Sequence, residues 1–293
     1  MNFVRRFLIL ISMAVLPIAV FAQDLDTAKI NQALGRSGQK VGDVYRFGFP
    51  RTDLHVVIHD LAIKPGLALG SWAAFSGTTD NAFVMGDLVL LEDEVNPVME
   101  KLRASGFEIT AVHNHLLGEV PRVLYMHYMG HGSEVDLATS LHAALAASKT
   151  PLGEPAAASA EPATPPDWAK TVEDTVGLKG NFRGGVLSFG VPRAETISMD
   201  GMTITPAQGV AESINFQEAD AGKVATTGDF VLTAAEVNPV ISALEQHHIL
   251  VTALHSHMLT EEPRLFFMHF WGYGPAQEVA AGMKAALDKV HTK

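Results

Sequence analysis

The chain of 293 residues contains one long segment twice, at a constant offset of 142 residues. Between residues 86 and 132, 22 of the 47 positions are identical to those 142 residues further on. From Gly86 and Gly228 onward, the copies carry the same motifs in the same order: Gly-Asp, Glu-Val-Asn-Pro-Val, His-x-His, Glu, Pro-Arg, Met-His and Gly-x-Gly. The match also runs upstream, where Phe47-Gly48-x-Pro50-Arg51 pairs with Phe189-Gly190-x-Pro192-Arg193. The repeat is longer than the roughly 20–50 residues of a solenoid unit, so each copy is expected to fold around its own core.

The segments outside the copies predict the remaining organisation. Residues 1–22 are typical of a secretory signal peptide, because two arginines precede an apolar run that ends at Val-Phe-Ala; an uncleaved N-terminal anchor is the alternative. Five prolines among alanines predict an extended linker at 149–166. We therefore expect a signal peptide at 1–22, a first module at 23–148, the linker, and a second module at 167–293. The mature protein would be periplasmic or secreted.

Composition excludes several classes of function. The chain has no cysteine, which rules out disulfides, thiolate metal sites, a cysteine nucleophile and an acylated cysteine. Its formal net charge of −11 argues against a nucleic-acid partner, because phosphate binding needs a basic face. No stretch after the N-terminal run is long and apolar enough to cross a bilayer, so we expect no membrane span after signal removal.

Local patterns predict the same order of elements in both copies. A short first helix (27–34 and 168–176) should end at Gly35 and Gly177, which suit a left-handed terminal residue. Alternating segments near 43–49, 54–59, 67–75 and 82–91 predict strands. Asn96 and Asn238 precede proline and predict helix N-caps. Two more strands (107–115 and 122–129) and a closing helix (134–147) complete an α+β module with a mainly antiparallel sheet flanked by helices.

Histidines at matching places are the strongest candidates for chemistry. Strand alternation places His113 and His115 on one face, and an antiparallel return brings His127 beside them. Three imidazoles suit Zn²⁺ first, and also copper, iron or nickel. Glu119 is the candidate fourth ligand or general base, and Arg122 the candidate receiver of an anionic group. The second copy repeats these residues as His255, His257, His269, Glu261 and Arg264.

Three other interpretations stand beside a metal site. The histidines could bind a polar ligand without metal, they could stabilise the fold alone, or they could act as a pH-responsive switch. Against a purely structural role, about half of the surrounding positions differ between the copies while all six histidines remain.

The motifs together resemble the LppY/LpqO family. The resemblance is carried by Gly86 to Leu90, Glu94 to Val98, Thr110 to Leu117 and Pro121 to Gly132, and by the second copies of these segments. It implies an exported, duplicated protein of unknown function and brings no established activity or catalytic residues. The lipoprotein anchor of the family's namesakes is not expected here, because the chain has no cysteine to acylate.

The sequence thus predicts an exported protein that binds a metal ion or small ligand through three histidines in each copy. The metal would be a divalent transition metal, with zinc first. A metal-dependent hydrolase with Glu119 and Glu261 as bases is one alternative. A cell-envelope interaction module with structural histidines is the other.

Overall fold

The structure, a computed structural model, describes residues 23–154 and 164–293. The predicted signal peptide and the middle of the predicted linker lie outside the described residues. Each copy forms one antiparallel six-stranded sheet. The first has the order β1 (Gln39–Val41), β2 (Val44–Pro50), β5 (Gly70–Thr78), β6 (Asn81–Leu91), β9 (Val123–Gly132) and β7 (Glu108–His113). The second has the same order with β10 (Asn181–Arg183), β11 (Val186–Pro192), β14 (Ala211–Asp220), β15 (Lys223–Leu232), β17 (Phe266–Pro275) and β16 (Leu250–His255).

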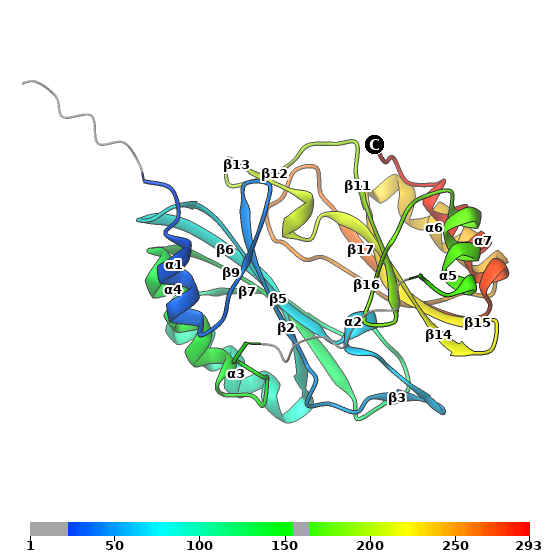
Figure 1. Cartoon of the computed structure of the whole chain (residues 1–293). Helices are drawn as coiled ribbons and strands as arrows, with labels where there is room; N and C mark the ends of the chain where they lie inside the picture. Colours follow the sequence, from blue (N-terminus) through cyan, green and yellow to red (C-terminus); the bar gives the residue numbers. More distant parts are fainter. Residues whose placement is uncertain (1–22, 155–163) are drawn as a thin grey trace, which may run out of the picture.

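Helices cover only one face of each sheet. The first sheet packs against α1 (Thr27–Leu34), α3 (Glu92–Ala104) and α4 (Glu134–Leu145), and the second against α5 (Asp167–Val176), α6 (Ala234–Gln246) and α7 (Ala276–Leu287). Figure 1 shows these helices on the two outer sides and the sheets between them. Each module has its own core of strand and helix side chains, as the length of the repeat predicted. The α+β fold with two tandem modules is therefore as expected.

The predicted N-caps at Asn96 and Asn238 are wrong by five residues, because the N-caps are Leu91 and Thr233. Helix α3 begins at Glu92 and α6 at Ala234, which leaves Pro97 and Pro239 inside the helices. The cause is a carboxylate in the first turn. Glu94 accepts the Leu91 amide at 2.9 Å, and Glu236 accepts the Thr233 amide at 2.7 Å. These bonds satisfy amide groups that an uncapped helix leaves free, so the helix starts before the Asn-Pro pair.

A buried arginine holds each of these helix starts against the sheet. Arg51 is fully buried, and its guanidinium lies 2.7 Å from Glu94 and 2.8 Å from Asp53. Arg193 lies 2.9 Å from Glu236 in the second module. Because both partners are largely removed from water, these pairs depend on their geometry far more than a surface ion pair does.

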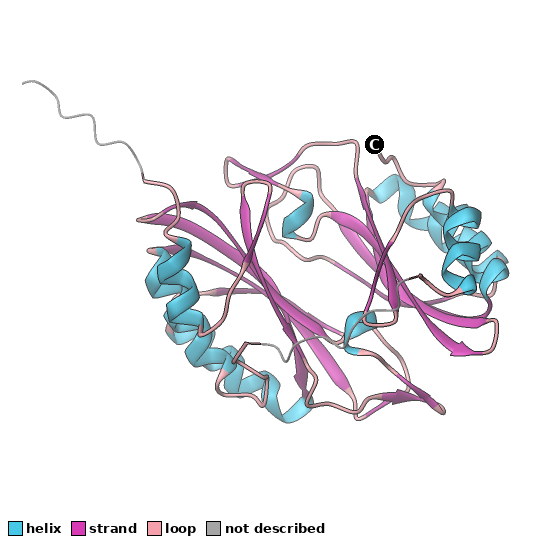
Figure 2. Ribbon diagram, in the orientation of Figure 1, coloured by secondary structure: helices cyan, strands magenta, loops and turns pink. Residues whose placement is uncertain are grey.

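The faces of the two sheets that carry no helices face one another (Figure 2). Apolar side chains from both modules share two clusters there; one joins Phe83, Met85 and Met129 to Val231 and Phe267. The first module also has α2 (Pro65–Ala68), β3 (Val57–Ile58), β4 (Leu61–Ala62) and β8 (Glu119–Val120), and the second has β12 (Ile197–Met199), β13 (Met202–Ile204) and the 3-10 helix η1 (Pro206–Gln208). Helix α2 lies between the sheets and contacts β5, β14 and β15. The molecule is a four-layer sandwich of helices, sheet, sheet and helices.

Direct hydrogen bonds fix the contact between modules. Thr252 donates to the His115 carbonyl at 2.6 Å, and Asn114 donates to the Thr252 carbonyl at 3.1 Å. Gln217 accepts the Lys64 amide at 2.8 Å and donates to the Ala62 carbonyl at 2.9 Å. Within the described residues, no helix is long and apolar enough to span a membrane.

Candidate functional site: a histidine cluster between the modules

The structure brings the three predicted histidines of each copy together. His113 ends β7, and His115 lies two residues further on. His127 lies on the adjacent β9, two positions from Tyr125, which is the partner of His113. The ring centre of His113 is 5.0 Å from that of His115 and 5.1 Å from that of His127. In the second copy, the His255 ring centre is 4.9 Å from His257 and 5.0 Å from His269.

The two triplets are not separate sites. His113 stacks on His255 at 3.6 Å, His115 on His269 at 3.7 Å and His127 on His257 at 3.7 Å. Since His257 and His269 are the repeat equivalents of His115 and His127, these contacts follow a pseudo-twofold axis that passes between His113 and His255. The sequence predicted one three-histidine site in each copy. The structure instead contains one six-membered group, called the histidine cluster below: His113, His115, His127, His255, His257 and His269.

Backbone carbonyls set the protonation of three rings. The Nδ1 of His269 donates to the Gly228 carbonyl at 2.8 Å, and His127 makes the equivalent bond to Gly86. The Nδ1 of His255 donates to the Ser256 carbonyl at 3.2 Å. In a neutral ring whose proton is on Nδ1, the lone pair is on Nε2. A carbonyl behind the ring and a free Nε2 in front is the arrangement found for metal-bound histidine.

Two of these free nitrogens face one another. The Nε2 atoms of His255 and His269 lie 2.9 Å apart. Because the Nδ1 atoms hold the protons of the neutral rings, no hydrogen lies between the two lone pairs, and the contact is repulsive. A cation bound by both nitrogens would remove this repulsion.

The rings are neutral near pH 7. Burial lowers the pKa of all six histidines, and for all but His255 the neighbouring imidazoles lower it further. The pKa of His255 falls to about 4 and that of His269 to about 3. Neutral imidazole is the form that binds metal.

Four of these histidines can reach one ion. One ligand atom from each of His113, His255, His257 and His269 lies within 4.8 Å of the others. Zinc–nitrogen bonds of about 2.0–2.1 Å in a tetrahedron place the nitrogens about 3.3 Å apart, so modest ring movements suffice. One of the four comes from the first module and three come from the second.

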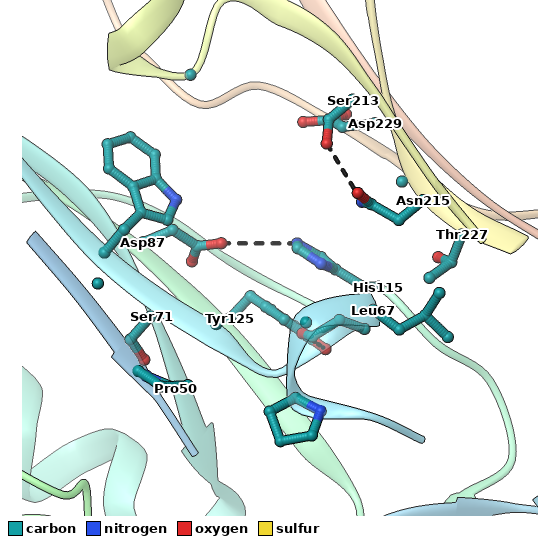
Figure 3. Close-up of a pocket in the computed structure, with 18 of the residues that line it drawn as sticks. Pro50, Leu67, Ser71, Asp87, His115, Tyr125, Ser213, Asn215, Thr227 and Asp229 are labelled. Atoms are coloured by element: carbon teal, nitrogen blue, oxygen red, sulfur yellow. Dashed lines mark hydrogen bonds and ion pairs between the residues drawn. The ribbon is translucent and has the colours of Figure 1, made fainter. Parts of the chain in front are cut away.

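Two aspartates were missed by the sequence analysis. Asp87 on β6 lies 3.8 Å from the Nε2 of His115, a contact drawn in Figure 3, and 3.9 Å from that of His127. Asp229 lies 3.4 Å from the Nε2 of His257. Burial raises the pKa of Asp87 to about 7 and that of Asp229 well above its usual value. The Gly-Asp motif was recognised only as a mark of the repeat, although an acid inside an apolar strand in both copies was a usable signal.

Several buried polar atoms of the site have no hydrogen-bond partner within the described residues. They are the Nδ1 atom of His113, the Nε2 atoms of His127 and His257, and the Oδ1 atoms of Asp87 and Asp229. Buried polar groups are normally paired, and four of these five residues line one cavity, where an ion, water or ligand would pair them.

The predicted bases lie away from the imidazoles. Glu119 accepts the Val123 amide at 3.3 Å, and Glu261 accepts the Leu265 amide at 3.0 Å. Both carboxylates are buried, and within the described residues neither has a hydrogen bond or ion pair with a histidine. These contacts hold the turn before β9 and β17. Catalysis by Glu119 and Glu261 stays a prediction without structural support.

The predicted anion-binding arginines also lie outside the cluster. Arg122 is exposed. Arg264 is half exposed; it pairs with Glu261 at 3.3 Å and donates to the Ser256 hydroxyl at 3.1 Å. Ser256 lies between two histidines of the cluster, so Arg264 contacts the site only through this loop. A ligand-binding role for either arginine stays a prediction.

A cavity of about 430 Å³ opens onto the cluster between β2, β5 and α2 of the first module and β14 and β15 of the second. Its walls include both aspartates and four of the six histidines: His115, His127, His257 and His269. Figure 3 shows Asp87 and His115 directed toward one another across this space, with Asn215, Thr227 and Asp229 on the opposite wall. The volume is suitable for a small molecule.

Comparison with known families assigns the chain to a family but gives it no activity. The model of a family described as "Domain of Unknown Function (DUF1259)" matches residues 28–147 and again residues 170–289. The chain belongs to this family. Its two DUF1259 matches fall on the two sheets and their helices. No curated protein matches the chain significantly.

Solved structures add little. The trimeric bacterial microcompartment shell protein PduB is 11% identical, with 87% of this chain and 89% of that chain covered and a TM-score of 0.21. EtuB from Clostridium kluyveri is 11% identical, with coverages of 86% and 90% and a TM-score of 0.20. TP0453 is 12% identical, with coverages of 90% and 98% and a TM-score of 0.20. Likeness at this level carries no argument about fold or function.

Proposed function

We propose that the protein binds one divalent transition metal ion, zinc first, in the histidine cluster between its two modules. The observation that carries the proposal is the pair of Nε2 atoms of His255 and His269 at 2.9 Å, each with its Nδ1 bonded to a backbone carbonyl. Two lone pairs held face to face are costly without a shared cation. His113 and His257 supply further nitrogens within reach of the same point.

The chemistry of the neighbouring groups supports the same proposal. The imidazoles are neutral near pH 7, and nitrogen ligands suit zinc, copper, iron and nickel. Asp87 and Asp229 lie close to the rings. A bound divalent ion would favour their ionised forms, whose negative charge would offset that of the ion. The duplication is the remaining support, because the aspartate and the three histidines of the first copy all recur in the second.

The proposal also covers the cellular location of the protein and its relation to the LppY/LpqO family. Residues 1–22 direct export, so the mature protein acts in the periplasm or outside the cell, and the chain is related to the LppY/LpqO proteins. Neither statement is needed for metal binding.

Elemental analysis of the mature chain, purified without a histidine tag, tests the proposal. We expect about one zinc-type ion per chain, lost in a His255→Ala/His269→Ala variant and retained in a His247→Ala/His248→Ala control, whose histidines are exposed at the end of α6. If the site variant does not fold, metal is removed from the wild type with a chelator and zinc is added back, which should raise the melting temperature. Substoichiometric metal that the site variant leaves unchanged, or a melting temperature insensitive to zinc, would refute the proposal.

A further inference from the structure

The cavity beside the cluster has an opening that the pseudo-twofold axis does not repeat. On one side of the interface, Phe83 and Met85 pack with Phe267 in an apolar cluster. The repeat equivalents of Phe83 and Met85 are Ala225 and Thr227, which are smaller. Thr227 lines the cavity instead of filling it. The differences between the copies therefore leave room for a ligand on one side only.

An arginine found in the first copy alone stands in the wall of this cavity. Arg46 lies with its guanidinium 4.2 Å from the centre of the Trp72 ring, and its NH1 donates to the Ala207 carbonyl. The equivalent positions in the second copy are Ser188 and Ile214. Among the described residues that line the cavity, Arg46 is the only arginine or lysine.

The guanidinium keeps donors for a ligand. Within the described residues its only hydrogen bond is the one to Ala207, while a guanidinium has five N–H groups. None of its nitrogens is among the fully buried, unpartnered atoms, and the residue lines the cavity. Burial lowers the pKa of Arg46 to about 10, which leaves it charged near pH 7. The Trp72 ring orients the guanidinium plane, as expected for a cation–π contact.

We infer that the cavity binds a small oxyanion, a carboxylate or a phosphate, with Arg46 holding the anionic group and the histidine cluster facing the other end of the molecule. The planar fork of arginine matches both kinds of oxyanion. The cavity volume of about 430 Å³ limits the ligand to a small molecule. This inference rests on the proposed function at one point. Asp87 is the acid whose charge acts on Arg46, and a divalent ion would offset the ionised forms of Asp87 and Asp229 and leave the charge of Arg46 uncompensated.

Calorimetric titration of the zinc-loaded protein tests the inference with three probes: malonate, inorganic phosphate and the uncharged malonamide. We expect malonate or phosphate to bind and malonamide not to bind, and the stronger of the two anions identifies the ligand class. Arg46→Gln should weaken anion binding by at least about tenfold, because a charged hydrogen-bonding partner is lost. The control is Arg183→Gln. Arg183 is exposed on β10 and does not line the cavity, so this variant should leave anion binding unchanged.

A second variant tests the cavity independently of Arg46. Thr227→Met introduces the side chain that the first copy has at the equivalent position 85 and should block the anion while zinc affinity stays within about threefold of wild type. Equal anion affinity in wild type and Arg46→Gln, or equal binding of malonamide and malonate, would overturn the inference. Zinc titrations of the same samples keep the two proposals apart. A zinc-loaded wild type that binds neither malonate nor phosphate refutes only this inference, and absence of zinc binding refutes the proposed function.

Discussion

A single substitution in either module decides whether the modules share one metal site. His113 is the one first-module residue in the four-histidine group, and His255 stacks on it from the second module at 3.6 Å. If the modules share one site, His113→Ala and His255→Ala should both lower the affinity for the same ion. In two independent sites, each variant should remove one ion and leave the other.

The size of the effect follows from the number of ligands. Four-coordinate zinc sites in small domains bind with apparent free energies of about 10–16 kcal/mol, so one of four ligands contributes roughly 3 kcal/mol. A loss of that size is roughly a 10²-fold rise in Kd. His247→Ala, an exposed histidine of the second module, serves as the control and should change Kd less than about threefold.

Competition with a chromophoric chelator measures Kd, and elemental analysis measures the number of ions per chain. The shared-site reasoning predicts about one ion in the wild type and a similar rise in Kd for His113→Ala and His255→Ala. Two ions in the wild type and one in each variant would refute it. So would a His113→Ala variant with wild-type affinity, because the site would then belong to the second module alone.

The remaining predictions concern stability. Removing the metal should lower the melting temperature by roughly 5–10 °C relative to protein with free zinc at 100 times Kd, as read by calorimetry, since saturation at that level contributes about 2.7 kcal/mol. Burial alone would raise the pKa of Glu94, but hydrogen bonds from Arg51 and from backbone amides lower it below its usual value. The stability that Glu94 provides is therefore present above the ordinary glutamate pKa and lost as the pH falls below it, and denaturant titrations should show a weaker acid dependence in Glu94→Gln. Gly228→Ala should melt well below wild type because its Cβ would lie 1.8 Å from the Ser213 carbonyl oxygen, whereas Gly190→Ala, with nothing within 4 Å, should melt close to it.

The fold was predictable because its signals are local. Gly35 and Gly177 end the first helices in the left-handed conformation, with φ of 72° and 80°. Alternation of apolar residues located most of the long strands. The predicted helix starts were wrong because a contact between residues far apart in the sequence overrides the local capping rule. Asn-Pro is a favourable N-cap sequence by itself. However, Glu94 accepts a hydrogen bond from Arg51, which lies 43 residues earlier in the sequence, and the helix starts before the Asn-Pro pair.

The candidate site was predictable only within each copy. Alternation along β7 and the antiparallel return of β9 are enough to bring His113 and His127 together, and His115 follows two residues after the end of β7. The stacking of His113 on His255 depends on how two separate modules dock, and no pattern inside one copy carries that information. Asp87 was missed for a related reason. It looked like part of a strand motif until its distances to the histidines were known.

The pattern of agreement between the copies is itself a functional argument. The positions that stay the same in both copies include those that form the cluster, namely the histidines and Asp87 with Asp229, and a shared ion would require both copies to keep them. Positions that differ between the copies, such as Arg46 and Thr227, line the cavity on one side. A ligand without twofold symmetry can bind beside a symmetric centre only if the two halves stop being equal. On this reasoning, introducing Arg at position 188, where the second copy has serine, would not create a second anion site, because Phe83 and Met85 already fill the matching space.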